Sequence, residues 1–418
     1  MQMEKYGAPG VFLVSSQFLA DAKSAAADWS MPNIRIVTIP SDKWYRNRGT
    51  VKEVRPLAEA ALNPIVEALT KPLTPEEAKP QQKAAVDYPP IRITGANYAD
   101  AEEKFNQSFL DNQMSDGLPL VPPTREAVAK MLKGTSRSPS EVIGKIPMKF
   151  GIATIEKIAI NAVMAGAKPE YLPVIIAAME AISAGGQWSM GFWHMMGSSG
   201  GFTLIIMVNG PIAKEINMNS GIGFLGDCWR ANSTIGRSVR LATRNIGHTW
   251  PAVNDMALTG RPSAHTFYTF AENEEMSPWE PYQVNQGFGK EDSTVTVTKV
   301  GSYIGASGQK VGGGAVETWT EQSILDGMLK EMTKSGSAVY NSYWLWFHPE
   351  AAQGLKTTSF TNRKDLQAWF AKKTGMPEKN ISIAVTGGVP GYSMIWDYGE
   401  GAHATKKITG ATLTKAGR

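Results

Sequence analysis

The 418-residue chain has one cysteine, Cys228, which excludes a disulfide within the chain and is typical of a reducing compartment. It also lacks a charge excess. Its 42 basic and 38 acidic residues leave a net charge of +4, and no dense basic run favours a nucleic-acid partner. No apolar run reaches the roughly 18 residues that a membrane span needs. The richest stretch, residues 159–182, is interrupted by Lys168, Pro169 and Glu170.

The N-terminal sequence MQMEKYGAPG lacks the basic segment and apolar core of a secretory signal peptide. Together with the single cysteine, this absence predicts a cytoplasmic protein with neither a membrane nor a nucleic-acid partner. Hydrophobic residues make up 42% of the chain and charged residues 19%, which is enough apolar material for a sizeable core. A chain of this length is expected to hold two domains.

Residues 1–70 have the alternating pattern of a parallel α/β fragment. Ser15 or Ser16 is expected to cap its first helix. Two strands alone do not make a stable sheet with covered faces, so we expect an incomplete Rossmann-like fold that needs further strands. The predicted strands are 11–14 and 34–39, and the predicted helices are 18–29 and 51–69.

Residues 71–90, KPLTPEEAKPQQKAAVDYPP, contain five prolines and little aliphatic bulk, which predicts a linker. Residues 91–418 then form the larger domain, and its mixed order of helical and strand patterns indicates an α+β or irregular α/β fold. The predicted helices are 99–112, 124–133, 154–165, 170–183, 233–245, 321–334 and 362–373, and the predicted strands are 202–208, 265–270, 295–300, 338–346, 381–385 and 392–396.

The segment GDCWRANSTIGRSVRLATRNIG at 226–247 predicts an anion site. Asn232, Ser233 or Thr234 is expected to cap a helix whose first turn presents unpaired N–H groups. Cys228 and Arg230 precede that positive end, which favours binding of an anion or a lowered thiol pKa. The alternative is an ordinary buried cysteine, with a solvated basic stripe formed by Arg237, Arg240 and Arg244.

The acidic segment AENEEMSPWEP at 271–281 follows a predicted strand. If the strand pattern continues, Glu272 and Glu274 project to one face, where paired carboxylates suit acid–base work or a hard metal ion. A solvated acidic loop is the alternative. A second loop, with Gly387 and Gly388 in GGVPG, also follows a predicted strand and permits close approach of a ligand to the backbone.

The segment WSMGFWHMM at 188–196 combines thioethers with His194, a set that can bind copper but more often lines a core. The five histidines show no HExxH or HxH spacing, so we assign no metal ligand and no cofactor.

The N-terminal stretch EKYGAPGVFLVSSQFLADAKSAAADWSMPNIRIVTIP resembles the second half of the UGSC-like family, named for a selenocysteine–Gly–Ser–Cys motif often found with cysteine instead. The motif itself does not occur in this chain. The larger domain resembles a region fused behind such domains in uncharacterised bacterial proteins. The similar stretches are SDGLPLVPPT, ATIEKIAINAVMAGAKPEYLPV, WRANSTIGRSVRLATRNIG, AENEEMSPWEP and VTGGVPGYS.

The resemblance implies a small-molecule enzyme, an oxidoreductase or lyase, whose thiol or selenol motif lies outside this sequence. We expect either a second subunit carrying the missing half of the N-terminal domain or a longer protein that begins upstream.

Our leading interpretation is therefore one subunit of a heteromeric enzyme acting on a small, anionic molecule. Arg230 would bind its anionic group, Glu272 or Glu274 would move protons, and the partner's thiol or Cys228 would be the nucleophile. The site would be completed by the start of the 233–245 helix, the two loops, and an apolar wall of Trp193, Trp229 and Trp279. The alternatives are a scaffold that completes a partner's sheet and a metal-dependent hydrolase or lyase.

Overall fold

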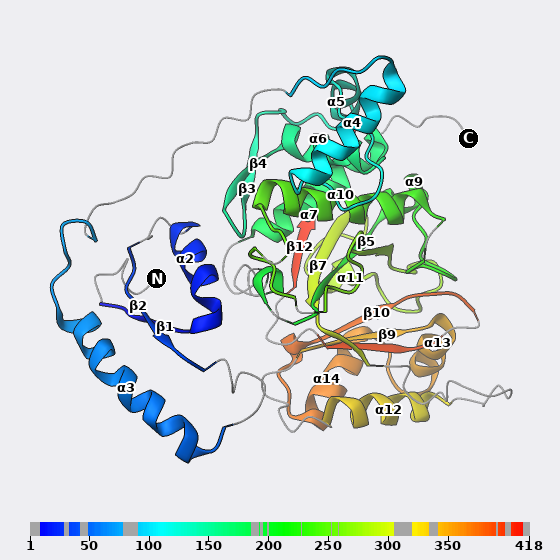
Figure 1. Cartoon of the computed structure of the whole chain (residues 1–418). Helices are drawn as coiled ribbons and strands as arrows, with labels where there is room; N and C mark the ends of the chain where they lie inside the picture. The colour runs from blue at the N-terminus through cyan, green and yellow to red at the C-terminus, as the bar shows by residue number, and fades with distance from the viewer. Residues whose placement is uncertain are drawn as a thin grey trace, which may run out of the picture. The chain divides into compact units, whose positions relative to one another are not determined.

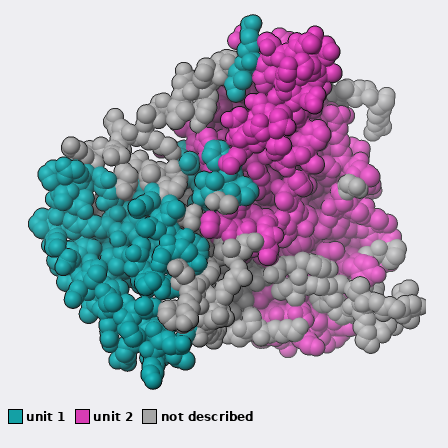
Figure 2. Space-filling view, in the orientation of Figure 1, with its two compact units in different colours: residues 1–92, 148–150, 249–254 teal, residues 93–147, 151–248, 255–418 magenta. Residues whose placement is uncertain are grey.

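The computed structural model divides the chain into two compact units (Figure 2). The first holds residues 1–92, 148–150 and 249–254, and the second holds the remainder. The residues that the structure describes are 9–28, 33–41, 49–77, 91–184, 192, 195–198, 200–226, 228–251, 253–257, 259–304, 320–333, 342–389, 392–397 and 403–412.

The first unit contains the predicted strand–helix–strand–helix order. Its two strands pair in parallel, with Phe12 opposite Ile36. Ser15 precedes a short 3-10 turn without capping it, and the Ser16 hydroxyl donates to the Ile39 carbonyl instead, so the predicted serine cap is wrong. The elements are β1 (Phe12–Ser15), η1 (Ser16–Phe18), α2 (Leu19–Asp28), β2 (Ile36–Ile39) and α3 (Val51–Thr70).

Arg35 ties the start of the predicted linker to this fragment. Its guanidinium pairs with the Glu77 carboxylate at 2.9 Å and donates to the carbonyls of Ala68, Lys71 and Pro72 at 2.7–2.8 Å. Residues 71–77 are therefore anchored rather than free, while the rest of the predicted linker, residues 78–90, lies outside the described residues.

The second unit has four layers (Figure 1). Helices α7 and α10 cover one face of a sheet of order β12-β7-β5-β6, and a second sheet of order β10-β9-β11-β8 packs on its other face. Helices α12, α13 and α14 cover the outer face of the second sheet. The strands are β5 (Thr203–Asn209), β6 (Tyr268–Ala271), β7 (Thr294–Val300), β8 (Ser302–Ile304), β9 (Tyr343–Phe347), β10 (Ile381–Val385), β11 (Met394–Asp397) and β12 (Ala404–Lys407).

The predicted mixed α/β class is confirmed, because each of the two four-stranded sheets contains both parallel and antiparallel pairs. No helix in the described part of the chain is long and apolar enough to cross a membrane. The helices of this unit are α4 (Tyr98–Asp111), α5 (Arg125–Leu132), α6 (Ile155–Met164), α7 (Leu172–Ser183), α9 (Pro211–Glu215), α10 (Arg230–Gly247), α11 (Tyr282–Asn285), α12 (Glu321–Thr333), α13 (Pro349–Thr358) and α14 (Arg363–Thr374), and β3 (Val142–Ile146) and β4 (Gly151–Thr154) form a separate hairpin-like pair.

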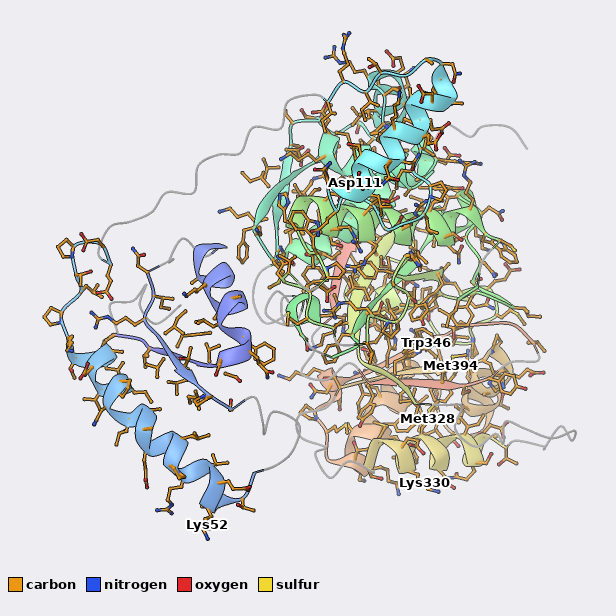
Figure 3. The ribbon with its side chains drawn as sticks, viewed as in Figure 1. Lys52, Asp111, Met328, Lys330, Trp346 and Met394 are labelled. Carbon is orange, nitrogen blue, oxygen red and sulfur yellow. The ribbon has the colours of Figure 1, made fainter. Side chains whose placement is uncertain are left out.

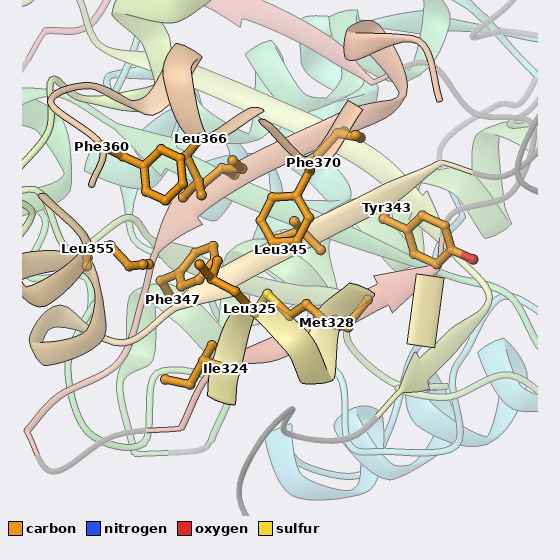
Figure 4. Close-up of a cluster of buried hydrophobic side chains, with 14 of the residues drawn as sticks. Ile324, Leu325, Met328, Tyr343, Leu345, Phe347, Leu355, Phe360, Leu366 and Phe370 are labelled. Atoms are coloured by element: carbon orange, nitrogen blue, oxygen red, sulfur yellow. The ribbon is translucent and has the colours of Figure 1, made fainter. Parts of the chain in front are cut away.

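Strand β9, YWLWF, explains how the two inner layers pack. Because successive side chains point to opposite faces, Tyr343, Leu345 and Phe347 enter the cluster against α12–α14 (Figure 4), and Trp344 and Trp346 enter the layer between the sheets. Figure 3 labels Trp346 and Met394 on the inter-sheet side, and Met328 on α12. All five strand residues are buried, which is typical of a strand covered on both faces.

Candidate functional site

The carboxyl ends of the parallel strands of both sheets meet in one region. The Glu272 backbone N–H donates to the carbonyl of Val208, near the end of β5, at 3.1 Å. The next residue, Asn273, donates its backbone N–H to the carbonyl of Val385, the last residue of β10, at 2.9 Å. Open α/β sheets bind ligands outside the carboxyl ends of their strands, so this edge is the candidate functional site.

Glu272 is buried and accepts four hydrogen bonds. The donors are the Asn209 side-chain amide at 2.6 Å, the Tyr282 N–H at 2.7 Å, the Arg363 guanidinium at 2.8 Å and the Val385 N–H at 3.2 Å. Both carboxylate oxygens are therefore satisfied, and the group connects the two sheets with α11 and α14. These contacts favour a positioning role over the proton transfer predicted from the sequence.

Arg363, in the first turn of α14, supplies the matching buried charge. It also donates to the carbonyl of Ile383 and to the carbonyl of Glu280, both at 2.9 Å. Its guanidinium lies 5.7 Å from the centre of the Tyr282 ring. Arg363 was not predicted from the sequence, because an arginine next to the Asn362 cap of a largely polar helix has the local pattern of a solvent-exposed side chain.

Glu274 lies in a different environment from Glu272, although both accept from the same Asn209 amide. Its Oε1 accepts from Asn209 Nδ2 at 3.0 Å and from the Gly210 N–H at 2.7 Å, and the side chain is half-buried. Burial raises the pKa of Glu274 above its ordinary value, and the nearby Glu272 charge adds to this, while the two hydrogen bonds oppose it. A positioned carboxyl with a raised pKa is suited to proton transfer near neutral pH.

The start of α10, which was predicted to lie beside the acidic and glycine loops, does reach this edge. Asn232 is buried, and its Oδ1 accepts from the Asn219 N–H at 2.9 Å. Its Nδ2 donates to the carbonyls of Asn219 and Phe224 at 3.1 and 3.3 Å. One asparagine therefore holds the loop at 219–224 against the first turn of α10.

The same loop connects to both predicted ligand loops. The Asn219 carbonyl accepts from Ala271 N–H at 3.3 Å, and the Ser220 carbonyl accepts from Gly387 N–H at 3.0 Å. The Asn273 side chain donates to the Gly387 carbonyl at 2.7 Å. The acidic segment, the glycine loop and the start of α10 thus meet around residues 219–224.

The two glycines of the second loop are explained by packing within the chain. Gly387 has a φ of +80°, a conformation that side chains disfavour. A Cβ on Gly388 would lie 2.3 Å from Ile222 Cγ1 and 2.9 Å from its backbone nitrogen. The close approach predicted at this loop is therefore to residue 222, and no ligand contact is needed to account for it.

The start of α10 differs from the prediction. The helix begins at Arg230, and Trp229 is its N-cap without a side-chain hydrogen bond. Ser233 and Thr234 lie inside the helix, where the Thr234 hydroxyl donates to the Arg230 carbonyl at 2.6 Å. The prediction that Asn232, Ser233 or Thr234 caps this helix is thus wrong, because the helix begins three residues earlier than the predicted start at residue 233.

The predicted cation and thiol of the site are both exposed. The Arg230 guanidinium donates to the carbonyl of Gly166 at 2.9 and 3.1 Å and remains accessible. Cys228 is exposed and has a φ of +74°, so the alternative of a buried cysteine is wrong.

The predicted tryptophan wall is not assembled in the described residues. Trp279 is buried in the core against α12–α14, where its indole N–H donates to the Phe360 carbonyl at 3.1 Å. Trp229 is about one-third exposed at 36%, at the start of α10. Trp193 and His194 lie outside the described residues.

A cavity of about 260 Å³ lies at the opposite end of β5 from the carboxylates. Thr203, the first residue of β5, lines it, and six residue steps at about 3.3 Å place it about 20 Å from Asn209. None of the residues that line this cavity was predicted from the sequence; they are Thr203, Leu225, Pro262, Tyr268, Val300, Gly301, Met394 and Trp396.

Two imidazoles, the buried His348 and the half-buried His403, have pKa values below physiological pH. Burial lowers the pKa of His348 to about 4, and its Nδ1 lies 3.0 Å from the Ser393 hydroxyl. Burial likewise lowers the pKa of His403 to about 4, and its Nε2 lies 2.8 Å from Gln286 Oε1. Both imidazoles therefore act as neutral hydrogen-bonding groups.

Within the described residues, no group of three or more His, Cys, Asp or Glu side chains is placed to hold a metal ion. The remaining acids of the 271–281 segment are solvent-exposed, and Glu275 pairs with Lys214 at 3.3 Å.

Comparisons with protein-family models, with curated proteins and with solved structures found no match. The resemblance to the UGSC-like family therefore stays a prediction from the sequence.

Proposed function

We propose that this chain is one subunit of a heteromeric enzyme that acts on a small organic molecule, with Glu274 as the proton-transfer group. The observation that carries this proposal is the contrast between the two carboxylates at the carboxyl edge. Glu272 is neutralised by Arg363 and fully hydrogen-bonded, whereas Glu274 is half-buried, held by two donors and raised in pKa. In such a pair the two acids have different roles: Glu272 holds the segment in place and Glu274 transfers the proton.

The start of α10 supports an anionic substrate. Its N-cap residue makes no side-chain cap, so the first-turn N–H groups keep their positive potential, and the exposed Arg230 and Cys228 lie beside them. A thiol from the partner, or Cys228, would supply the nucleophile for redox or carbon–heteroatom bond chemistry.

The test is a turnover assay on mixed metabolites. The chain would be co-expressed with the product of the gene immediately upstream, purified, and incubated with a cell extract cleared of protein. Mass spectrometry is expected to show one anionic compound consumed and a related one formed. A folded complex that changes no compound would contradict an enzymatic function and would favour the alternative of a non-catalytic scaffold.

The exposed apolar surface of α3 supports the partner subunit. Val54, Leu62, Val66 and Leu69 are all exposed, and their spacing places them within one face of the helix. Ala61 is the buried residue of this 20-residue helix, and Phe12 and Leu13 on β1 are exposed as well. An apolar stripe of this kind is typical of a surface that another element covers.

A charge on this stripe is expected to dissociate the complex. Replacing Leu62 by glutamate puts a carboxylate into the proposed interface, so we expect the heteromer to weaken at least tenfold, measured by analytical ultracentrifugation. The control is Asn63→Glu, which adds the same charge at the neighbouring position outside the stripe and should leave assembly intact. Equal assembly of both variants would remove α3 from the interface.

A further inference from the structure

On the basic face of α10, Arg240 is buried and Arg237 and Arg244 are half-buried, so the alternative of a solvated basic stripe is wrong. Arg237, Arg240 and Arg244 occupy this face at i, i+3 and i+7. Arg237 is neutralised by Asp116, with two hydrogen bonds of 2.8 and 2.9 Å. Arg240, one turn further along, is 3% exposed.

Arg240 makes few contacts for a buried guanidinium. Its Nε donates to the Ala264 carbonyl at 3.3 Å, its Nη2 lies 3.7 Å from an Asp255 oxygen, and its guanidinium lies 5.6 Å from the centre of the Phe267 ring. Its Nη1 is buried and has no hydrogen-bond partner in the described part of the chain. The Nε of Arg244 is also buried and has no hydrogen-bond partner in the described part of the chain.

Asp255, the carboxylate closest to Arg240, is already paired with Arg261. Asp255 accepts from Arg261 Nε at 3.0 Å through each of its oxygens, and from Arg261 Nη2 at 2.6 Å. Arg261 also donates to four backbone carbonyls, so its fork is fully used, and the acceptors belong to Met196, Ser198, Gly200 and Phe202.

The charges of this cluster do not balance. Four guanidiniums, including the paired Arg237, face two carboxylates, Asp116 and Asp255, which leaves an excess of two positive charges among the described side chains. A buried charge is strongly unfavourable unless it is paired and hydrogen-bonded, and an unmade buried hydrogen bond adds to that cost. Among the described residues, no further carboxylate lies close enough to balance these two charges, so the cluster is suited to an added anion.

We propose that Arg240 and Arg244 form a binding site for the oxyanion group of a small molecule, on the helix-covered side of the first sheet. Guanidinium groups bind carboxylates and phosphates through paired N–H···O bonds. The buried Nη1 of Arg240 and Nε of Arg244 would donate to such a group after the enclosing side chains move to admit it. The site is distinct from the Glu274 edge, because Ala264 and Phe267 precede β6 whereas Glu272 follows it. The proposal does not depend on the proposed enzymatic function.

The test is isothermal titration calorimetry of the 418-residue chain after exchange into a chloride buffer. Inorganic phosphate and acetate would be titrated separately at matched ionic strength, so that non-specific screening is the same in both. We expect saturable binding of one anion per chain. Binding of phosphate indicates a phosphoryl ligand, and binding of acetate alone indicates a carboxylate ligand, and either result supports the site.

Three variants locate the binding. Arg244→Gln, at a half-buried position, is expected to raise the Kd at least tenfold. Arg240→Gln is expected to raise the Kd at least as much, and circular dichroism checks that this variant is folded. Arg237→Lys, on the same face, keeps the positive charge beside the buried Asp116 carboxylate and should stay within about twofold of wild type. The proposal is overturned if neither anion binds saturably, or if Arg244→Gln binds as tightly as wild type.

Discussion

Replacing Arg363 by methionine is expected to lower the free energy of unfolding of the second unit by about 3–5 kcal/mol. The methionine keeps much of the side-chain volume, but it leaves the Glu272 carboxylate buried without its counter-charge. It also leaves the carbonyls of Ile383 and Glu280 without the arginine donor. The measurement is urea unfolding followed by tryptophan fluorescence, which reports on the inter-sheet layer that contains Trp344 and Trp346.

Two further variants distinguish the cost of leaving Glu272 buried without a counter-charge from the cost of breaking an exposed ion pair. Lys407→Met breaks the half-exposed pair with Asp292 and should cost less than about 1 kcal/mol. Glu272→Gln combined with Arg363→Met should recover part of the single-variant loss, because no buried charge is left alone. A loss of under 1 kcal/mol in Arg363→Met would mean that the pair does not hold the two sheets together.

Replacing Glu274 by glutamine is expected to lower turnover of the complex about 10²–10⁴-fold, the usual contribution of a general acid or base. Glutamine keeps an oxygen that can accept from Asn209 and Gly210, but it cannot exchange a proton. The measurement is the rate of loss of the compound found in the metabolite assay. Glu275→Gln is the matched control, because the neighbouring side chain is exposed and should change turnover by less than about twofold.

The stability of the same variant distinguishes chemistry from folding. The folded-state pKa of Glu274 lies above its ordinary value, so this group contributes stability below the unfolded pKa and loses it as the pH rises through the folded pKa. Neutral glutamine removes that loss, and the variant should be at least as stable as wild type at pH 7. A variant that loses turnover and also unfolds more easily would indicate a structural role for Glu274.

The sequence predicted the buried strands well and the short polar elements poorly. Strand β10 has the predicted bounds, because ISIAV is an apolar run with strong β propensity. Strand β12, ATKK, was missed, since a half-exposed edge strand ending in lysines is indistinguishable from a loop until its pairing with β7 is known. Helix α13 was missed as well, although Pro349 at its first position is a start signal.

The candidate site was predicted in its parts but not in its connections. Glu274, Asn232 and Gly387 were named from local patterns, and the structure brings their segments together around residues 219–224. Two of the four hydrogen-bond partners of Glu272, Asn209 and Arg363, come from positions 63 residues earlier and 91 residues later in the chain. Contacts of that separation depend on sheet order, which local patterns do not contain, so neither Asn209 nor Arg363 could be found from the sequence.

The central claim is that this chain works as part of a heteromer, and native mass spectrometry of the chain co-expressed with the product of the gene immediately upstream tests it most directly. We expect a complex that contains both polypeptides and that the Leu62→Glu substitution dissociates. A folded, homo-oligomeric chain without the second polypeptide would contradict the heteromer and leave Cys228 and the acidic segment of this chain as the place to look for its chemistry.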